Sequence, residues 1–222
     1  MKKNRDLENL FVVEGEKMVR ELMVDWPDLI QCICTVEPTV DWQGEVYHTD
    51  ERTLKEISQL NTPNKLLAVV KKPSLIAEKE EFILALDGVQ DPGNMGTILR
   101  TADWFNVDKI VCSMTTVDIF NTKVIQSSMG SLFRIPVEYV DLNEYLSSTK
   151  LPVYGALLEG DNVYHQTLSA NGIVVMGNEG NGISDEIKPL IQYPICIPRF
   201  GGAESLNVSV ATGILLNEFK RT

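Results

Sequence analysis

The stretch DPGNMGTILRTADWF, residues 91–105, predicts a loop that leads into an amphipathic helix. Asn94 is a good N-cap residue, so we expect the helix to begin near Met95. At about 100° per residue, one face collects the apolar side chains that would pack on a core, namely Met95, Ile98, Leu99, Ala102 and Phe105. A helix that follows a glycine-containing loop and buries one face is typical of α/β folds.

Arg100 points away from the apolar face and shares its side of the helix with Gly96 and Trp104. A lone arginine on a helix is usually solvated, here with Asp103 as its nearest partner, and that is the simpler interpretation. Gly96 leaves the backbone bare beside Arg100. A functional role for Arg100 therefore depends on what the rest of the chain contains.

The chain on either side of this helix predicts an α/β protein of two domains. The expected strands of the larger domain are FILALD (82–87), KIVCS (109–113), IPVEYV (135–140), LPVYGALL (151–158), GIVVMG (172–177) and YPICIP (193–198). Such continuous apolar runs are typical of a parallel sheet that is covered on both faces. Residues 1–72 predict a small α/β domain, residues 73–81 a polar linker, and residues 82–222 the larger domain.

Composition indicates an ordinary globular protein, since 44% of the 222 residues are hydrophobic and 23% are charged. No apolar run approaches the ~20 residues of a membrane helix. The start, MKKNRDLENLF, is basic but has no apolar core, so we expect no signal peptide and a cytoplasmic protein.

The net charge of −11 argues against nucleic-acid binding through a general basic field. The two predicted domains are both acidic, so an RNA partner would have to rely on local patches. Two patches are candidates: Lys2, Lys3 and Arg5, and Lys65, Lys71 and Lys72. Taken alone, they favour the simpler prediction of a solvated terminus and a solvated linker.

The cysteines and histidines do not form a metal-binding pattern. The four cysteines are Cys32, Cys34, Cys112 and Cys196, and the only histidines are His48 and His165. No C-x-x-C pair occurs and the histidines are far apart, so we expect buried, reduced thiols and no zinc site.

Three stretches share one pattern, in which a strand ends, a loop rich in glycine and small polar residues follows, and a helix begins. They are residues 86–100, 174–184 and 196–210. Ligands of parallel α/β proteins bind beyond the carboxyl ends of the strands, where glycines let the backbone approach them. The pattern therefore predicts one ligand site built by three loops.

Other nucleotide-binding and hydrolytic sites are poorly supported. GNEGNG at 177–182 spaces its glycines as G-x-x-G-x-G, which differs from the dinucleotide pattern, and no phosphate-binding G-x-x-x-x-G-K-[ST] loop occurs. Ser184 and Ser205 have no histidine nearby in the sequence and neither lies in G-x-S-x-G, so a hydrolase triad is not indicated.

In this order, DPGNMGTILRTA, MGNEGNGIS and IPRFGGAESLNVSVATGILL resemble the three motifs of the SpoU/TrmH-like branch of the SPOUT RNA methyltransferases. The earlier stretches FVVEGEKMVREL and LNTPNKLLAVVKKP are similar to the small substrate-binding domain that often precedes this enzyme. The resemblance covers nearly the whole chain. It implies S-adenosylmethionine-dependent methylation of a ribose 2′-hydroxyl in structured RNA, either ribosomal or transfer RNA, and a trefoil knot in the C-terminal domain.

The resemblance also implies which residues hold the cofactor and which act on the substrate. The expected cofactor-binding residues are Leu157, Gly177, Asn178, Glu179, Gly180, Ile197 and Leu206. The expected catalytic residues are Arg100, Asn94, Ser205, Asn207 and Glu179. An arginine is a doubtful general base, so we expect Arg100 to grip a phosphate beside the target ribose and to lower the pKa of its hydroxyl. We expect Glu179 to order a loop. The resemblance also implies that the side of the helix that carries Arg100 is the active site and that Gly96 makes room there for the substrate.

The family works as a homodimer in which the catalytic arginine serves a site built partly by the other subunit. The stretch LNVSVATGILLNEF, 206–219, fits this because its apolar residues surround the helix axis, as in a deeply buried or interface helix. Two alternatives remain at this point. One is an RNA-binding or ribosome-assembly factor without catalysis, and the other is a nucleotide-binding enzyme of Rossmann type.

Overall fold

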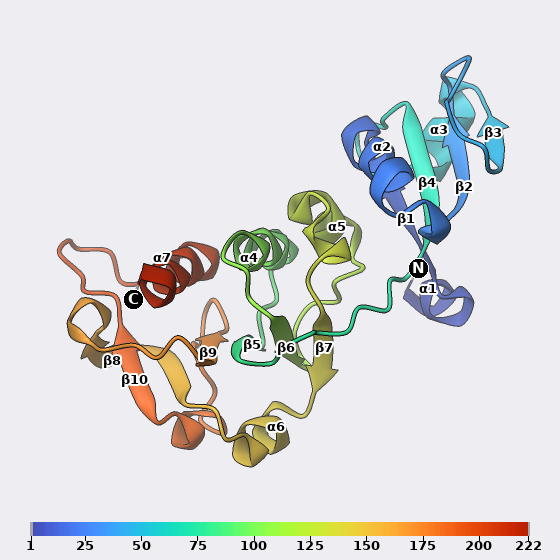
Figure 1. Cartoon of the computed structure of the whole chain (residues 1–222). Coiled ribbons are helices and arrows are strands. Elements are labelled where there is room, and N and C mark those ends of the chain that lie inside the picture. The colour runs from blue at the N-terminus through green and yellow to red at the C-terminus, as the bar shows by residue number, and fades with distance from the viewer. Residues whose placement is uncertain (1, 222) are drawn as a thin grey trace.

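The structure, a computed structural model, describes residues 2–221 and contains two β-sheets (Figure 1). The smaller sheet has the order β1 (Leu10–Glu14), β4 (Leu66–Lys71), β2 (Ile30–Thr35), β3 (Val46–His48). The larger sheet has the order β10 (Tyr193–Cys196), β8 (Val153–Asn162), β9 (Gly172–Gly177), β5 (Phe82–Asp87), β6 (Lys109–Ser113), β7 (Val137–Val140). All its neighbouring strands pair in parallel, which confirms the predicted α/β class and the six predicted strands.

Helices cover both faces of the larger sheet. Its helices are α4 (Pro92–Trp104), α5 (Thr122–Ser128), α6 (Leu142–Ser148) and α7 (Val208–Arg221), and those of the N-terminal region are α1 (Lys2–Glu8), α2 (Glu16–Asp25) and α3 (Glu51–Ile57). Short 3₁₀ turns are η1 (Pro27–Leu29), η2 (Ser131–Phe133), η3 (Val163–His165) and η4 (Lys188–Leu190). The prediction that a helix begins after the loop at 174–184 is wrong, because only the short turn η4 lies in the described segment between β9 and β10. Figure 1 shows α4, α5 and α7 on one face of the sheet and α6 on the other.

The alternation of side chains along β5 explains why two layers of helices form. Every residue of β5 is buried. Leu84 and Leu86 belong to the apolar cluster that includes Ile98 of α4, whereas Ile83 belongs to the cluster that includes Leu142 of α6. A central parallel strand that is apolar on both faces needs helices on both sides.

Helix α4 begins three residues earlier than the sequence predicted. Asp91 is the N-cap, and its Oδ1 accepts a hydrogen bond from the backbone N–H of Asn94 at 2.9 Å. Pro92 occupies the first helical position, where its missing N–H costs nothing. The prediction that Asn94 caps the helix is therefore wrong, and its side chain is available for other contacts.

Gly96 does not make room for a substrate. It is buried, and a Cβ on Gly96 would lie 1.9 Å from the Ser127 side-chain oxygen. Gly96 is therefore needed for the close approach of α4 and α5, and this prediction is also wrong. Arg100 is exposed as predicted, but Asp103 is not its partner, because Asp103 accepts a hydrogen bond from Arg134 at 2.7 Å.

The two basic patches are only partly solvated. Residues 2–8 form a helix that was not expected, and Arg5 from it pairs with Asp118 at 2.7 Å. Lys72 pairs with Asp6 over the same distance. Lys2 is exposed. The prediction of two solvated patches therefore fails for Arg5 and Lys72, which join parts of the molecule together.

The four cysteines are free thiols, but only Cys112 is buried, whereas we expected all four to be. Burial raises the pKa of the Cys112 thiol. Within residues 2–221, no cluster of His, Cys, Asp and Glu side chains is arranged to hold a metal ion. In the same part of the chain, no helix combines the length and the apolar character needed to cross a membrane.

Helix α7 is buried along one side only. Leu215, Leu216 and Phe219 are buried, whereas Val210 is 52% exposed. The expectation of a helix that is covered on most sides is therefore met only in part within one chain. The trefoil knot stays a prediction.

Candidate active site

The loops that follow β5 and β9 meet at the carboxyl ends of these neighbouring strands. Asn178 Nδ2 donates a hydrogen bond to the carbonyl oxygen of Gly88 at 2.7 Å. The backbone N–H of Ser184 donates to Asp87 Oδ2 at 2.7 Å. Because adjacent parallel strands end at the same edge, residues about 90 positions apart come into contact there.

Glu179 holds the first loop to the second. Its carboxylate accepts hydrogen bonds from the backbone N–H groups of Gln90 at 3.2 Å and Asp91 at 3.0 Å, and from Asn94 Nδ2 at 3.1 Å. Partial burial alone would raise the pKa of Glu179, but these hydrogen bonds outweigh it and leave the pKa below its ordinary value. The carboxylate therefore accepts hydrogen bonds from three groups of residues 90–94.

Asn207 joins the third loop to the same cluster. Its Nδ2 donates to Asn94 Oδ1 at 2.9 Å. Its Oδ1 accepts from the backbone N–H of Ser209 at 2.9 Å, at the start of α7. Glu179, Asn94 and Asn207 thus form a chain of hydrogen bonds across the three loops.

A cavity of about 480 Å³ lies beside this chain of hydrogen bonds. Its lining includes every residue for which a cofactor role was expected, namely Leu157, Gly177, Asn178, Glu179, Gly180, Ile197 and Leu206. Ser205 lines it as well. The structure thus brings these eight residues together.

The cavity suits a ligand that has a flat apolar part and polar ends. Met176, Ile195 and Leu215 add apolar surface that the sequence analysis did not single out. The polar residues of the lining are Asn178, Glu179, Asn181, Arg199, Glu204 and Ser205. Its size lies within the range of about 300–1,000 Å³ that is usual for small-molecule sites. Adenine, ribose and an amino-acid end, the parts of S-adenosylmethionine, match this lining.

Some of the site residues that the sequence analysis did not name could have been predicted from a local sequence pattern, and others could not. Asp87 is an acidic residue at the end of a fully apolar strand, and that placement could have indicated a loop-ordering role. Ile195 and Met176 sit in strand ends beside the loops, so they could have been included. Leu215 lines the cavity from α7 and no local pattern indicates this.

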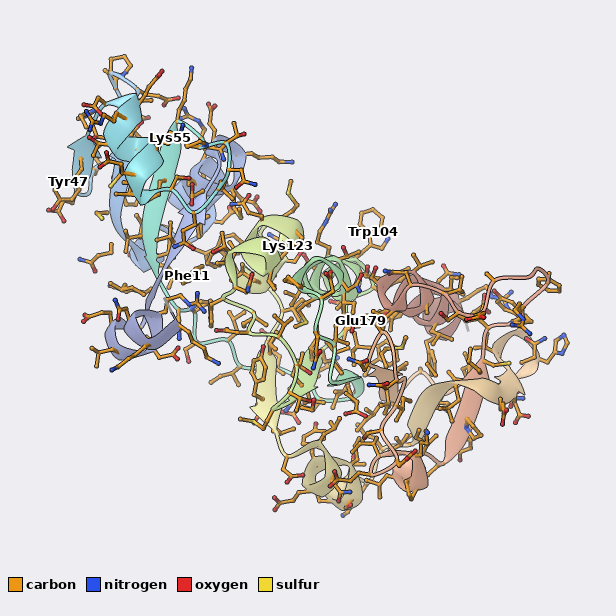
Figure 2. All side chains as sticks on the ribbon, turned by 180° about the vertical axis from the view of Figure 1, so that it is seen from behind. Phe11, Tyr47, Lys55, Trp104, Lys123 and Glu179 are labelled. Atoms are coloured by element: carbon orange, nitrogen blue, oxygen red, sulfur yellow. The ribbon has the colours of Figure 1, made fainter. Side chains whose placement is uncertain are left out.

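Arg100 lies outside the cavity of its own chain. It is exposed on the outer side of α4 and does not belong to the cavity lining. Trp104, one turn further, is 84% exposed, and Figure 2 shows it projecting from the helix layer. Within one chain, the Arg100 guanidinium therefore lies away from the cluster that the three loops form.

A shallow groove of about 510 Å³ runs between α4 and α7 on this outer side. Thr97, Val210, Gly213 and Ile214 line it, together with Tyr164 after β8. Val210 and Tyr164 are 52% and 42% exposed. Apolar surface on a helix that also contributes to a ligand cavity is a candidate contact face.

The fold and the site together define a class, namely parallel α/β proteins whose small-molecule site is built by loops at the carboxyl ends of strands. Residues 81–217 match the SpoU rRNA Methylase family, and residues 1–68 match the MRM3-like substrate binding domain. The chain belongs to the SpoU rRNA methylase family.

Relatives of known name agree with this assignment. The chain is 33% identical to the 23S rRNA (guanosine(2553)-2′-O)-methyltransferase RlmP of Bacillus subtilis, over 97% of this chain and 90% of that protein. A TrmH-family structure from Porphyromonas gingivalis is 37% identical, with a TM-score of 0.84, and covers 100% of this chain and 93% of its own. An AdoMet-bound rRNA methyltransferase from Sinorhizobium meliloti is 30% identical, with a TM-score of 0.83, over 100% and 90% of the chains.

Proposed function

We propose that the protein transfers a methyl group from S-adenosylmethionine to a ribose 2′-hydroxyl of structured RNA, with 23S ribosomal RNA as the first substrate to test. The observation that carries the proposal is the joining of three motif loops, through Glu179, Asn94 and Asn207, beside one cavity. The activity is the one named for the Bacillus subtilis relative.

The cofactor is assigned to this cavity. Leu157, Ile197 and Leu206 would pack on its adenine, and the backbone of residues 177–180 would hold its polar groups. Bound there, S-adenosylmethionine supplies an electrophilic methyl group. The protein's own contribution is to fix the line of attack and to make a ribose hydroxyl more nucleophilic.

Arg100 is the residue that would act on the hydroxyl. A guanidinium stays protonated, so it is better suited to grip the neighbouring phosphate and lower the pKa of the hydroxyl than to accept a proton. Asn94 would hold the first loop in place, and Ser205 and Asn207 would contact substrate or cofactor at the start of α7. Asn207 already caps that helix, so both roles are compatible.

A homodimer would bring Arg100 to the cavity. Arg100 and the groove between α4 and α7 lie on the outer side of the helix layer, while the cavity opens among the loops. A second copy seated on the groove, against Val210 and Ile214, would place the Arg100 of one chain beside the cavity of the other. This explains why an exposed arginine can be catalytic although its own chain holds it outside the cavity.

Residues 1–72 are assigned as the RNA-binding domain, and residues 73–81 as the linker. The match to a substrate-binding domain supports the first assignment. Because both domains are acidic, RNA affinity would come from local contacts and would be modest and dependent on salt. A ribosomal RNA substrate would place the protein in the cytoplasm.

The proposal is tested by tritiated methyl transfer from S-adenosylmethionine to total ribosomal and transfer RNA from a strain that lacks the gene. We expect incorporation into one RNA at a 2′-O position. Retention of RNA without incorporation would indicate a binding or assembly factor instead. Calorimetry should detect S-adenosylmethionine binding and no NAD binding, and the reverse result would indicate a Rossmann-type enzyme.

A further inference from the structure

The N-terminal region, residues 2–72, is docked on the catalytic part of the molecule by contacts at both ends of α5. Within α5, Gln126 Nε2 donates to the carbonyl oxygen of Glu14 at 2.8 Å, and Phe120 and Phe133 lie just before and after this helix. The Phe11 ring lies 4.9 Å from that of Phe120 and 5.9 Å from that of Phe133, and Figure 2 shows Phe11 where the two parts meet. Side chains, rather than the covalent linker alone, therefore set the orientation of this region.

Arg134 connects the docked region to the helix that carries Arg100. Arg134 Nη1 donates to Glu21 of α2 at 2.9 Å, and its Nε donates to Asp103 of α4 at 2.7 Å. Ser131 Oγ donates to the same oxygen of Asp103 at 2.8 Å. One guanidinium thus joins a helix of the N-terminal region to α4, three residues after Arg100.

The surroundings hold this guanidinium in one orientation. Its central carbon lies 5.8 Å from the ring centroid of Trp26, and Trp26 in turn stacks on Phe133 at 5.5 Å. The carboxylates of Glu21 and Asp103 meet different nitrogens of the same fork. A lysine has a single point charge and could not reproduce this bridging geometry.

We propose that Arg134 is a positioning residue for RNA methylation. By fixing α2 against α4, it sets where RNA held by the N-terminal region meets Arg100. This inference rests on the proposed function, because it assumes that residues 1–72 bind the RNA. A polar linker of nine residues would by itself let that region move by many ångströms, whereas a misplacement of about 1 Å can cost about 100-fold in rate.

The test compares Arg134→Gln and Glu21→Gln with the control Lys188→Gln. Lys188 pairs with Asp185 at 2.7 Å, and both lie outside the N-terminal region and outside the cavity lining. Methyl transfer to total ribosomal RNA from the deletion strain gives kcat/KM, and calorimetry gives S-adenosylmethionine affinity. We expect Arg134→Gln and Glu21→Gln each to lower kcat/KM for RNA by about 10- to about 100-fold, with cofactor affinity unchanged. The double variant should be no worse than Arg134→Gln alone, and Lys188→Gln should match the wild type.

Trypsin cleavage at the exposed Lys79 of the linker reports docking without reference to RNA. We expect faster cleavage in Arg134→Gln and Glu21→Gln than in Lys188→Gln. If Arg134→Gln does not fold, Glu21→Gln, which loses only the link to α2, decides the question.

Unchanged kcat/KM in both variants, or a parallel loss of cofactor affinity, would overturn the positioning role. A wild type that methylates no RNA would instead overturn the proposed function, and the cleavage rates would still decide whether Arg134 holds the two parts together.

Discussion

Asn207 donates a hydrogen bond to Asn94 over 2.9 Å, although 113 residues separate them in the chain. Both polar atoms of the Asn94 side chain are therefore hydrogen-bonded, since its oxygen accepts from Asn207 and its nitrogen donates to Glu179. A flipped amide would place two acceptors or two donors against each other, so the orientation of Asn94 is fixed. The three loops are therefore held by a side chain whose two ends have different, matched partners.

Replacing Asn207 separates its two roles. Asn207→Ala removes the cap of α7 and should lower the free energy of unfolding by about 0.5–2 kcal/mol. Asn207→Asp keeps the capping oxygen but places a carboxylate against Asn94 Oδ1, so methyl transfer should fall by about tenfold or more while stability stays near that of the wild type. Urea unfolding and methyl incorporation check both outcomes. Full activity of Asn207→Asp would show that the bond to Asn94 does not matter for catalysis.

The contribution of Glu179 to stability should depend on pH. Its pKa in the folded protein lies below the ordinary value of 4.5, so its hydrogen bonds stabilise the fold above that value, and this contribution is lost as pH falls through the folded pKa. Wild type should exceed Glu179→Gln in free energy of unfolding at neutral pH, and the difference should shrink below about pH 4.5. Urea titrations at neutral and acidic pH measure it. A difference that does not change with pH would contradict this role.

Gly177 should tolerate no side chain. A Cβ there would lie 2.1 Å from the Gly182 carbonyl carbon and 2.2 Å from the Ile183 nitrogen, so the loop 178–183 would have to move. We expect Gly177→Val to abolish S-adenosylmethionine binding and Gly177→Ala to cost about 1–3 kcal/mol of stability, as overpacking does. At Gly180 the nearest atom is 3.6 Å away, so Gly180→Ala is the control for stability. Calorimetry and thermal melting provide the readouts, and equal melting temperatures would refute the steric argument.

Arg100→Ala should lower the rate of methyl transfer by about 100- to about 1,000-fold, which is the usual effect of losing a group that stabilises developing charge. Cofactor affinity and melting temperature should not change, because Arg100 is exposed and outside the cavity of its chain. In the proposed dimer, mixing Arg100→Ala subunits with Gly177→Val subunits should restore some activity, since one site in a mixed dimer would have both an intact cavity and an intact arginine. If activity does not recover in a mixture that is shown to exchange subunits, the arginine and the cavity of one active site belong to the same chain.

Val210→Glu should dissociate the proposed dimer. Val210 is 52% exposed in the groove between α4 and α7, so a charge there should have little effect on the fold of one chain. Sedimentation should show monomers, and methyl transfer should be lost. Ile76→Glu is the control, because Ile76 is 87% exposed in the linker, outside both the groove and the region assigned to RNA binding. A dimer that persists in Val210→Glu would exclude this face as the interface.

The sequence predicted the parallel sheet and the three loops because apolar strands and glycine loops leave local patterns. The start of α4 was misplaced because Asp91 and Asn94 are both good caps, and Pro92 at the first helical position was the deciding residue. Gly96 was misinterpreted because a bare backbone suits a ligand and a neighbouring helix equally, and only tertiary contact with α5 distinguishes them.

Contacts between distant residues could not be predicted in this way. Arg134 meets Glu21 across 113 residues, and neither residue lies in a recognisable motif. The helix α6 was also missed, although Asp141 and Glu144 form a local capping pattern at its start. The roles of Arg100, Asn94, Ser205 and Asn207 stay predictions, which the variants described above test.

The parallel order of the larger sheet also determines how slowly the chain can fold. No two of its neighbouring strands can be joined by a tight hairpin, since each parallel pair needs a crossover. The central pair β5–β9 joins residues about 90 positions apart, so much loop-closure entropy is lost before the core forms. In a partly folded chain, strands that have not yet paired expose apolar surface and can aggregate. Overproduction at low temperature or with chaperones should therefore raise the yield of native protein.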